Sequence, residues 1–212
     1  MEQEVILHEQ LHSLQRIDVV ANETLNFFFV LFGTEPIERR VVFTLADGSR
    51  VNVKGLVLGS EQAEINLTTE VIHAGCGTEG FTTVKGLLGG NAHATVTGWI
   101  RIPESGHNTN AFLEERFMLL SKGARAKAEP MLEILANDVK ASHAATVSRL
   151  NDDQLFYCES RGIDPAESKR LLTEAFMNDI IRMIPDESIV AQCAGYLARS
   201  LLSNSREPRT RA

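Results

Sequence analysis

Cysteine is scarce in this sequence, and no two cysteines form a CxxC pair. Cys76, Cys158 and Cys193 are the only three in 212 residues, and they are widely spaced. An odd number of distant cysteines argues against a disulfide framework and fits a reducing compartment. We therefore expect a cytoplasmic protein that is held together by a hydrophobic core.

Long hydrophobic runs are missing as well. The most apolar stretch, FFFVLF at residues 27–32, is far shorter than the roughly 20 residues that a membrane-spanning helix needs. It reads instead as a buried strand. The first ten residues, MEQEVILHEQ, contain no basic segment and no long apolar stretch, so they do not form a secretory signal. We expect no membrane association.

Positive charge is in the minority, with 21 Lys and Arg against 28 Asp and Glu, and a net charge of −7. This balance argues against a nucleic-acid surface.

The glycines of GLLGG at residues 86–90 match neither a phosphate-binding loop nor a dinucleotide fingerprint. No GxSxG elbow is present either, so a serine hydrolase is not indicated.

One enzyme motif does occur near the start of the chain. His8, Glu9 and His12 satisfy the HExxH pattern, in which two histidines on one helix face bind zinc while the glutamate activates water. We expect a short helix over residues 1–14. However, no preceding sheet is available to build a substrate cleft, and no downstream motif marks a third ligand. Zinc-dependent hydrolysis is therefore kept as an alternative.

The first two thirds of the chain alternate between turn signals and short strand-like runs. The expected strands are rich in β-branched and aliphatic residues, and they lie at residues 17–32 (interrupted at Asn22), 41–45, 51–53, 56–58, 65–72, 94–102, 117–120 and 132–135. No helical periodicity crosses this region. The pattern predicts an all-β fold, and its spacing alone leaves open a sandwich, a barrel or a β-solenoid.

Helical signals begin after Leu150. Asn151 or Asp152 can cap a first helix that Gly162 ends. Asp164 followed by Pro165 starts a second helix, which Pro185 ends. Its expected apolar stripe comprises Leu171, Leu172, Phe176, Met177, Ile180, Ile181, Met183 and Ile184, and a third helix is expected over residues 186–203. We divide the chain into a leading segment (1–40), a β core (41–150), a helical domain (151–203) and a flexible tail (204–212).

The strand around His143 carries the most informative residue. Side chains two apart share a face of a strand, so His143 shares its face with Val139, Ala141, Ala145 and Val147. This face is small and apolar apart from the imidazole. Two readings remain open: a core histidine with one hydrogen-bonding partner, or a functional imidazole that ligates iron or handles a proton.

The same region resembles the SufB/SufD family of iron–sulfur cluster assembly proteins. The matching stretches are LEI at residues 132–134, NDVKASHAATVSRL at 137–150 and DQLFYCESRGI at 153–163, and the resemblance extends over about residues 69–184. It implies a right-handed parallel β-helix followed by a small helical domain. It also implies a non-catalytic scaffold that pairs through the β-helix and docks a SufC-like ABC ATPase through its helices.

Within that family the pattern is SufD-like. SufB-like sequences have glutamates beside the histidine and a cysteine about two strands earlier. Here Ser142 and Ala144 flank His143, and residues 110–120 contain no cysteine. Only His143 transfers as a site residue, near a transient iron–sulfur cluster.

The resemblance also implies partners. One would be a SufB-like chain or a second copy of this chain. The ATPase would dock on the exposed side of the second helix, which carries Lys169, Arg170, Glu174 and Arg182. A structural β-helix homodimer without cluster chemistry is the remaining alternative.

Overall fold

The computed structural model describes residues 2–7 and 11–204. The strands are β1 (Glu2–Leu7), β2 (Leu14–Val19), β3 (Thr24–Gly33), β4 (Ile37–Leu45), β5 (Arg50–Gly59), β6 (Glu64–Ile72), β7 (Glu79–Leu88), β8 (His93–Ile102), β9 (Thr109–Leu119), β10 (Arg125–Ile134) and β11 (Val139–Arg149). The helices are α1 (Asp152–Ser160), α2 (Pro165–Ile181) and α3 (Glu187–Asn204). Residues 205–212, which belong to the expected tail, lie outside the described residues.

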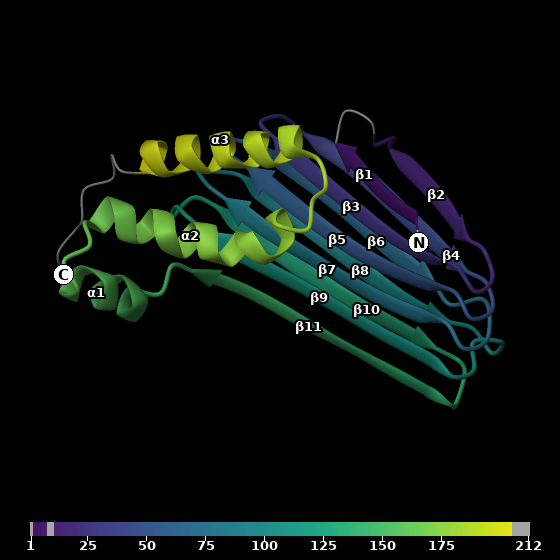
Figure 1. Ribbon diagram of the computed structural model, residues 1–212. Helices are drawn as coiled ribbons and strands as arrows, with labels where there is room; N and C mark the ends of the chain where they lie inside the picture. Colours follow the sequence, from purple (N-terminus) through teal and green to yellow (C-terminus); the bar gives the residue numbers. More distant parts are fainter. Residues whose placement is uncertain (1, 8–10, 205–212) are drawn as a thin grey trace.

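The strands form two parallel sheets that wind around one another as a β-helix (Figure 1). The odd-numbered strands make one sheet in the order β1-β3-β5-β7-β9-β11, here called sheet A. The even-numbered strands make the other, β10-β8-β6-β4-β2, here called sheet B. Each strand therefore pairs with the strand two places along the chain. The predicted parallel β-helix is confirmed, and its ladder already includes β1, β2 and β3, before residue 41.

Stacked side chains fill the space between the two sheets. In sheet A one inward row runs from Phe27 through Val53, Thr82 and Leu113 to His143. The next inward row, two residues further along each strand, is Phe29, Gly55, Val84, Glu115 and Ala145. A Cβ at position 55 would collide with the ring of Phe29, so glycine is required there by packing. Lys54 and Gly55 pair with both β3 and β7, so residues 51–53 and 56–58 form one strand and not the two that were expected.

The N-terminal helix expected over residues 1–14 is wrong, because Glu2–Leu7 is strand β1 and pairs in parallel with β3. The pairing is long-range in sequence, and nothing within the first fourteen residues reveals it. Strand β7 was also absent from the expected list, because its threonines and glycines make a weak local strand signal.

The helices cover the outer face of sheet A. Phe28, Val30, Leu56, Leu58 and Leu87 point outward from the sheet and form a second core with residues from α2, α3 and the segment between them. The helical partners are Met177, Ile180, Ile184, Ile189, Cys193, Tyr196 and Leu197. Sheet A is therefore buried on both faces where α2 and α3 lie, which explains the continuous apolar run at residues 27–32.

The expected starts of α1 and α2 are confirmed by the observed caps, whereas α2 ends at Ile181, so that Met183 and Ile184 of the expected stripe lie beyond it. The side chain of Asn151 accepts hydrogen bonds from two backbone amides at the start of α1, and Asp164 accepts one from Ala166 at the start of α2. Gly162 has a φ of 85°, a conformation that glycine adopts without strain after a helix. Within the expected stripe of α2, Met177 and Ile180 are buried, whereas Leu171 is 38% exposed.

Candidate functional site

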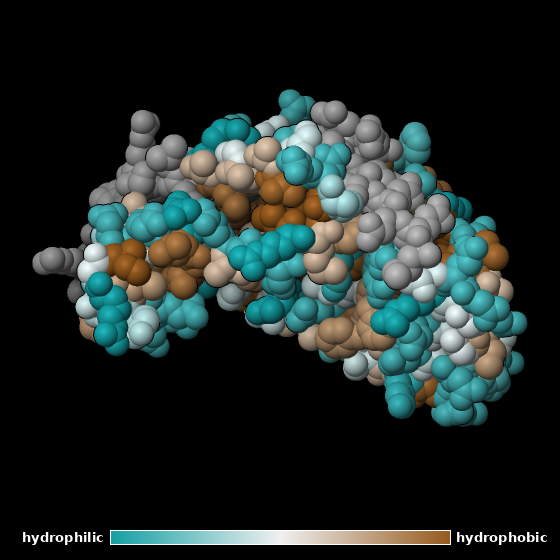
Figure 2. All heavy atoms as spheres, in the orientation of Figure 1, coloured by the Kyte–Doolittle hydropathy of each residue, from teal (hydrophilic) through white to brown (hydrophobic). Residues whose placement is uncertain are grey.

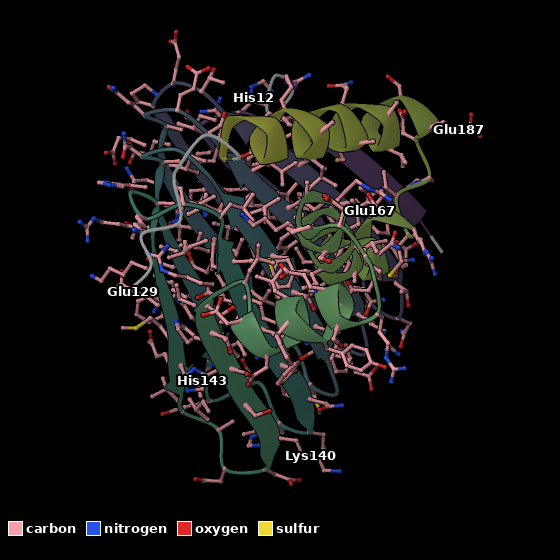
Figure 3. All side chains as sticks on the ribbon, turned by 90° about the vertical axis from the view of Figure 1, so that its left-hand side faces the viewer. His12, Glu129, Lys140, His143, Glu167 and Glu187 are labelled. Carbon is pink, nitrogen blue, oxygen red and sulfur yellow. The ribbon has the colours of Figure 1, made fainter. Side chains whose placement is uncertain are left out.

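His143 lies in the middle of β11, which is the last strand of sheet A. Its ladder neighbour is the buried Leu113, so the imidazole faces inward as the alternation predicts. Nevertheless the side chain is exposed, because no further strand covers β11 in the part of the chain that the structure describes. It therefore stands on the open end of the β-helix. Figure 3 shows it on this terminal coil, distant from His12.

The open end is a surface built from the inward faces of β10 and β11. Apart from His143, these faces carry small or apolar side chains: Ala126, Ala128, Pro130, Leu132 and Ile134 from β10, and Val139, Ala141, Ala145 and Val147 from β11. Leu132, Ile134 and Val147 are 37%, 39% and 43% exposed. Each of the two strands also has one edge that no described strand pairs. Such an edge is a template for a further strand.

Directly below the open end lies Glu115, the last inward residue of its row before Ala145. The side chain is fully buried, and neither carboxyl oxygen has a hydrogen-bond partner of normal geometry among the described residues. Burial raises the pKa of Glu115 to about 8; the charge of Glu129 adds to this effect, while the backbone amides of Glu129 and Gly98 oppose it. The carboxyl group is thus largely protonated at neutral pH.

Two other buried groups belong to the core. His73 is fully buried, and its Nδ1 lies 2.8 Å from the hydroxyl of Thr78, which in turn lies 3.0 Å from that of Thr109. Burial lowers the pKa of His73 to about 4, so its ring is neutral. Cys193, on α3, is buried in the second core between the helices and sheet A. Burial raises the pKa of its thiol to about 11. Neither group faces the open end.

The HExxH pattern does not form a zinc site in the described residues. His8, Glu9 and Gln10 lie outside them, and His12 is an exposed residue in irregular backbone ahead of β2. The catalytic pattern requires both histidines on one helix face. Among residues 2–7 and 11–204 no group of three or more His, Cys, Asp or Glu side chains could hold a metal ion.

The four residues expected to dock an ATPase lie on α2 or at its end. Arg170 makes ion pairs with Glu167 (2.6 Å) and Glu174 (2.5 Å) within the helix. Arg182 is exposed at the C-terminal cap, and Lys169 is half-buried. Next to α2, helix α1 has no buried residue, and its Phe156 and Tyr157 are 73% and 59% exposed. Figure 2 shows apolar surface on this helical side of the molecule.

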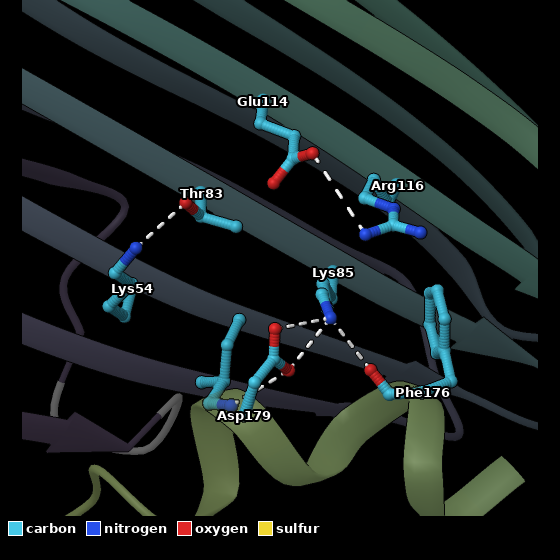
Figure 4. A network of polar contacts seen from close by, with 8 residues as sticks. Lys54, Thr83, Lys85, Glu114, Arg116, Phe176 and Asp179 are labelled. Carbon is cyan, nitrogen blue, oxygen red and sulfur yellow. Dashed lines mark hydrogen bonds and ion pairs between the residues drawn. The ribbon is translucent and has the colours of Figure 1, made fainter.

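A polar network joins α2 to sheet A (Figure 4). The side chain of Lys85 is only 4% exposed, and its Nζ donates to both carboxyl oxygens of Asp179 at 2.7 Å and to the carbonyl of Phe176 at 2.8 Å. Lys54 donates to Thr83 nearby. Sequence reasoning missed this network, although a lysine inside the apolar stretch TTVKGLL was a signal for a buried charge with a partner.

No helix among the described residues is both long and apolar enough to cross a membrane.

Comparison with known proteins agrees with this geometry. Residues 10–176 match the family model described as the SUF system FeS cluster assembly, SufBD core domain. The iron–sulfur cluster assembly protein SufD of Bacillus subtilis is 34% identical over 155 residues, which are 73% of this chain and 36% of that protein. SufD of Escherichia coli is 30% identical over 122 residues, 58% of this chain and 29% of that protein. A SufBD family protein of Synechocystis is 39% identical over 98 residues, 46% of this chain and 22% of that protein. The chain therefore spans about a third or less of the length of these relatives.

Proposed function

Because the chain belongs to the SufBD core family of the SUF iron–sulfur cluster assembly system, we propose that it is a SufD-like scaffold subunit of such an assembly complex. It pairs through the open end of its β-helix and docks a SufC-like ABC ATPase through its helices. Its role is to hold a nascent cluster, not to catalyse a reaction by itself. The cluster is the cargo of the complex.

The position of His143 carries this proposal. An imidazole that faces inward on an uncovered terminal coil is accessible to iron and to a partner chain at once. Imidazole is a good ligand for iron, but it is a poor sole anchor for an iron–sulfur cluster, which thiolates normally hold. The remaining ligands therefore come from a partner or from sulfide. The open end is where a partner would supply them.

The composition of the open end favours pairing. Leu132, Ile134 and Val147 expose apolar side chains beside two unpaired strand edges, and exposed apolar groups of this kind mark interaction sites. A SufB-like chain or a second copy of this chain would cover them and extend both sheets. This arrangement places His143 inside the interface.

The helical side supports ATPase docking. The exposed aromatic side chains of Phe156 and Tyr157 provide an apolar anchor, and aromatic residues are enriched in the contacts that dominate interface energies. Arg182 and the ion-paired Arg170 add a charged rim. A pull-down with a SufC-like ATPase tests this surface. Replacing both Phe156 and Tyr157 with alanine should abolish capture of the ATPase, and replacing both Arg170 and Arg182 with alanine should weaken it. Arg16→Ala, on strand β2, is the control and should leave capture unchanged. Capture that all of these variants retain contradicts the docking proposal.

The decisive experiment concerns His143. In a complex reconstituted with the partner and the ATPase, His143→Ala should lower cluster formation at least tenfold while leaving the fold and ATPase binding intact. Lys140→Ala is the matched control, because Lys140 is exposed on the same strand (Figure 3) and, three positions before His143, lies on its opposite face. An unchanged cluster yield with His143→Ala would leave a structural β-helix pair without cluster chemistry as the better description.

A further inference from the structure

Glu115 and His143 occupy neighbouring rows on the inward face of sheet A. His143 stacks on Leu113, and Glu115 lies under Ala145, so the two residues are offset by one strand and two positions. A strand spacing of about 4.8 Å and a rise of about 3.3 Å per residue put their Cα atoms roughly 8 Å apart. Side chains as long as glutamate and histidine can share one metal ion across such a separation.

Only small side chains lie near Glu115 on the side of the open end. Only the methyl group of Ala145 stands above it in its own row, and alanine also occupies position 141 on the other side of His143. On sheet B, the carboxyl group lies close to Gly98, where a Cβ would come within 2.7 Å of Oε1. Glycine at position 98 therefore accommodates the carboxyl group, and alanine at positions 141 and 145 leaves only methyl groups beside His143 on its face of β11.

The unmet hydrogen-bonding capacity of Glu115 is costly to the fold. A buried polar group without a partner destabilises a protein by a few kcal/mol, and a buried charge costs more. An apolar residue would pack at this position without that cost, as Val84 does one strand below. A carboxyl group without a hydrogen bond of normal geometry and an exposed imidazole offer the ligand types that ferrous iron accepts, which are oxygen and nitrogen donors.

We propose that Glu115 and His143 form a two-residue ferrous iron site at the open end of the β-helix. His143 supplies a ring nitrogen and Glu115 a carboxylate oxygen, and its carboxyl proton passes to solvent when the metal binds. The other coordination positions remain open for sulfide, water or a partner's side chain. This inference rests on the proposed function, and it gives the chain an oxygen ligand where it lacks a cysteine.

The test is an anaerobic titration of the purified full chain with Fe²⁺ alone, in competition with a chromogenic chelator. The wild-type chain should bind one equivalent. Glu115→Gln should weaken binding at least tenfold, because an amide oxygen is a weaker ligand than a carboxylate. His143→Ala should weaken it to a similar extent, and the double variant should lose little more, because each change dismantles the same site.

Glu114→Gln is the matched control. Glu114 precedes Glu115 on β9 but faces outward toward Arg116, so its substitution should leave iron affinity unchanged. The thermal midpoint of Glu115→Gln should not fall below that of the wild type, which separates lost binding from lost folding. Wild-type affinity in Glu115→Gln together with weak binding in His143→Ala would overturn this inference and leave the proposed function standing. Unchanged binding in both variants, or no binding by the wild type, would overturn the inference and remove the support that His143 gives to the proposed function.

Discussion

At the scale of single residues, the inward rows of sheet A show how one strand position acquires different properties along the β-helix. Phe27, Val53, Thr82 and Leu113 are buried because another coil lies above each of them, whereas His143 is exposed because no coil among the described residues covers it. The alternation of the sequence predicted the face of His143 correctly. It could not predict exposure, since exposure depends on where the stack of coils ends.

Glu115 was missed in the sequence, although a signal was present. Leu113, Glu115 and Phe117 alternate on one face of β9, and the two apolar neighbours are buried. A glutamate in phase with a buried face is a candidate for a functional carboxyl group. The adjacent Glu114 and Arg116 made the stretch look like an ordinary charged surface.

The first prediction concerns Glu115 and pH. Its pKa is raised to about 8 in the folded protein and returns to the ordinary value of about 4.3 in the unfolded chain. The unfolded state therefore loses its proton first, and the free energy of unfolding should fall as the pH rises between these values. Glu115→Gln should remove this loss and be more stable than the wild type at pH 8 by a few kcal/mol. Urea unfolding at pH 5.5 and pH 8 measures it; an equal pH dependence in both proteins would contradict the burial of an ionisable group.

His73 provides a second prediction with the opposite slope. Burial lowers its pKa to about 4, so in the acid range the unfolded state binds a proton that the folded state excludes. The contribution of this neutral ring to stability is complete above about pH 6.5 and is lost as the pH falls toward 4. His73→Gln should flatten that part of the stability profile. Thermal midpoints between pH 4.5 and 7.5 test this, and a wild-type slope in the variant would exclude His73 as its cause.

At the scale of elements, local signals and long-range pairing explain what was predicted and what was not. The helix caps at Asn151 and Asp164 were predicted because capping depends on a few neighbouring residues. Strand β1 was not, because its structure depends on pairing with β3, more than twenty residues away. Strands read from aliphatic runs were right in position but too short, since glycine and threonine continue them.

The ion pair between α2 and sheet A gives the third prediction. Asp179→Ala leaves the buried ammonium group of Lys85 without its carboxylate, and removing one partner of a buried pair costs about 3–5 kcal/mol. Since the side chain of Asp179 is 62% exposed, solvent screens the pair, and we expect a smaller loss of about 2 kcal/mol. Lys85→Met should cost less than Asp179→Ala, because it removes the buried charge and leaves unpaired only the Asp179 carboxylate, which is largely exposed to water. Glu174→Ala, on the exposed side of α2, should cost no more than about 0.5 kcal/mol. Chemical unfolding of the three variants measures these values, and equal losses for Asp179 and Glu174 would contradict the network.

At the scale of the whole molecule, the open end of the β-helix exposes apolar side chains to solvent. The parallel β-helix came from the family resemblance, because the turn spacing alone fitted three all-β architectures. The fold then explains why the terminal coil combines exposed aliphatic side chains, free strand edges and an imidazole in one place. We expect a partner to cover this surface.

The fourth prediction tests that expectation by disruption. Leu132→Glu together with Val147→Glu places two carboxylates on the open end, where apolar contacts would otherwise form. The double variant should sediment as a monomer or fail to bind a SufB-like partner, with an unchanged circular dichroism spectrum. Leu14→Glu, an exposed leucine (46%) on β2 at the far end of sheet B, is the matched control. Equal loss of assembly in control and variant would mean that the open end has no special role.

Amide hydrogen exchange along β10 and β11 tests the central claim most directly. It compares the chain alone with the chain bound to a SufB-like partner or, for self-pairing, a dilute with a concentrated sample. Exchange should slow at least tenfold at the free-edge amides of residues 139–149 and 125–134 when the partner binds, while β1 and β2 remain unchanged. Unchanged exchange in β11, with protection appearing instead at the β1 and β2 edges, would contradict assembly through the open end.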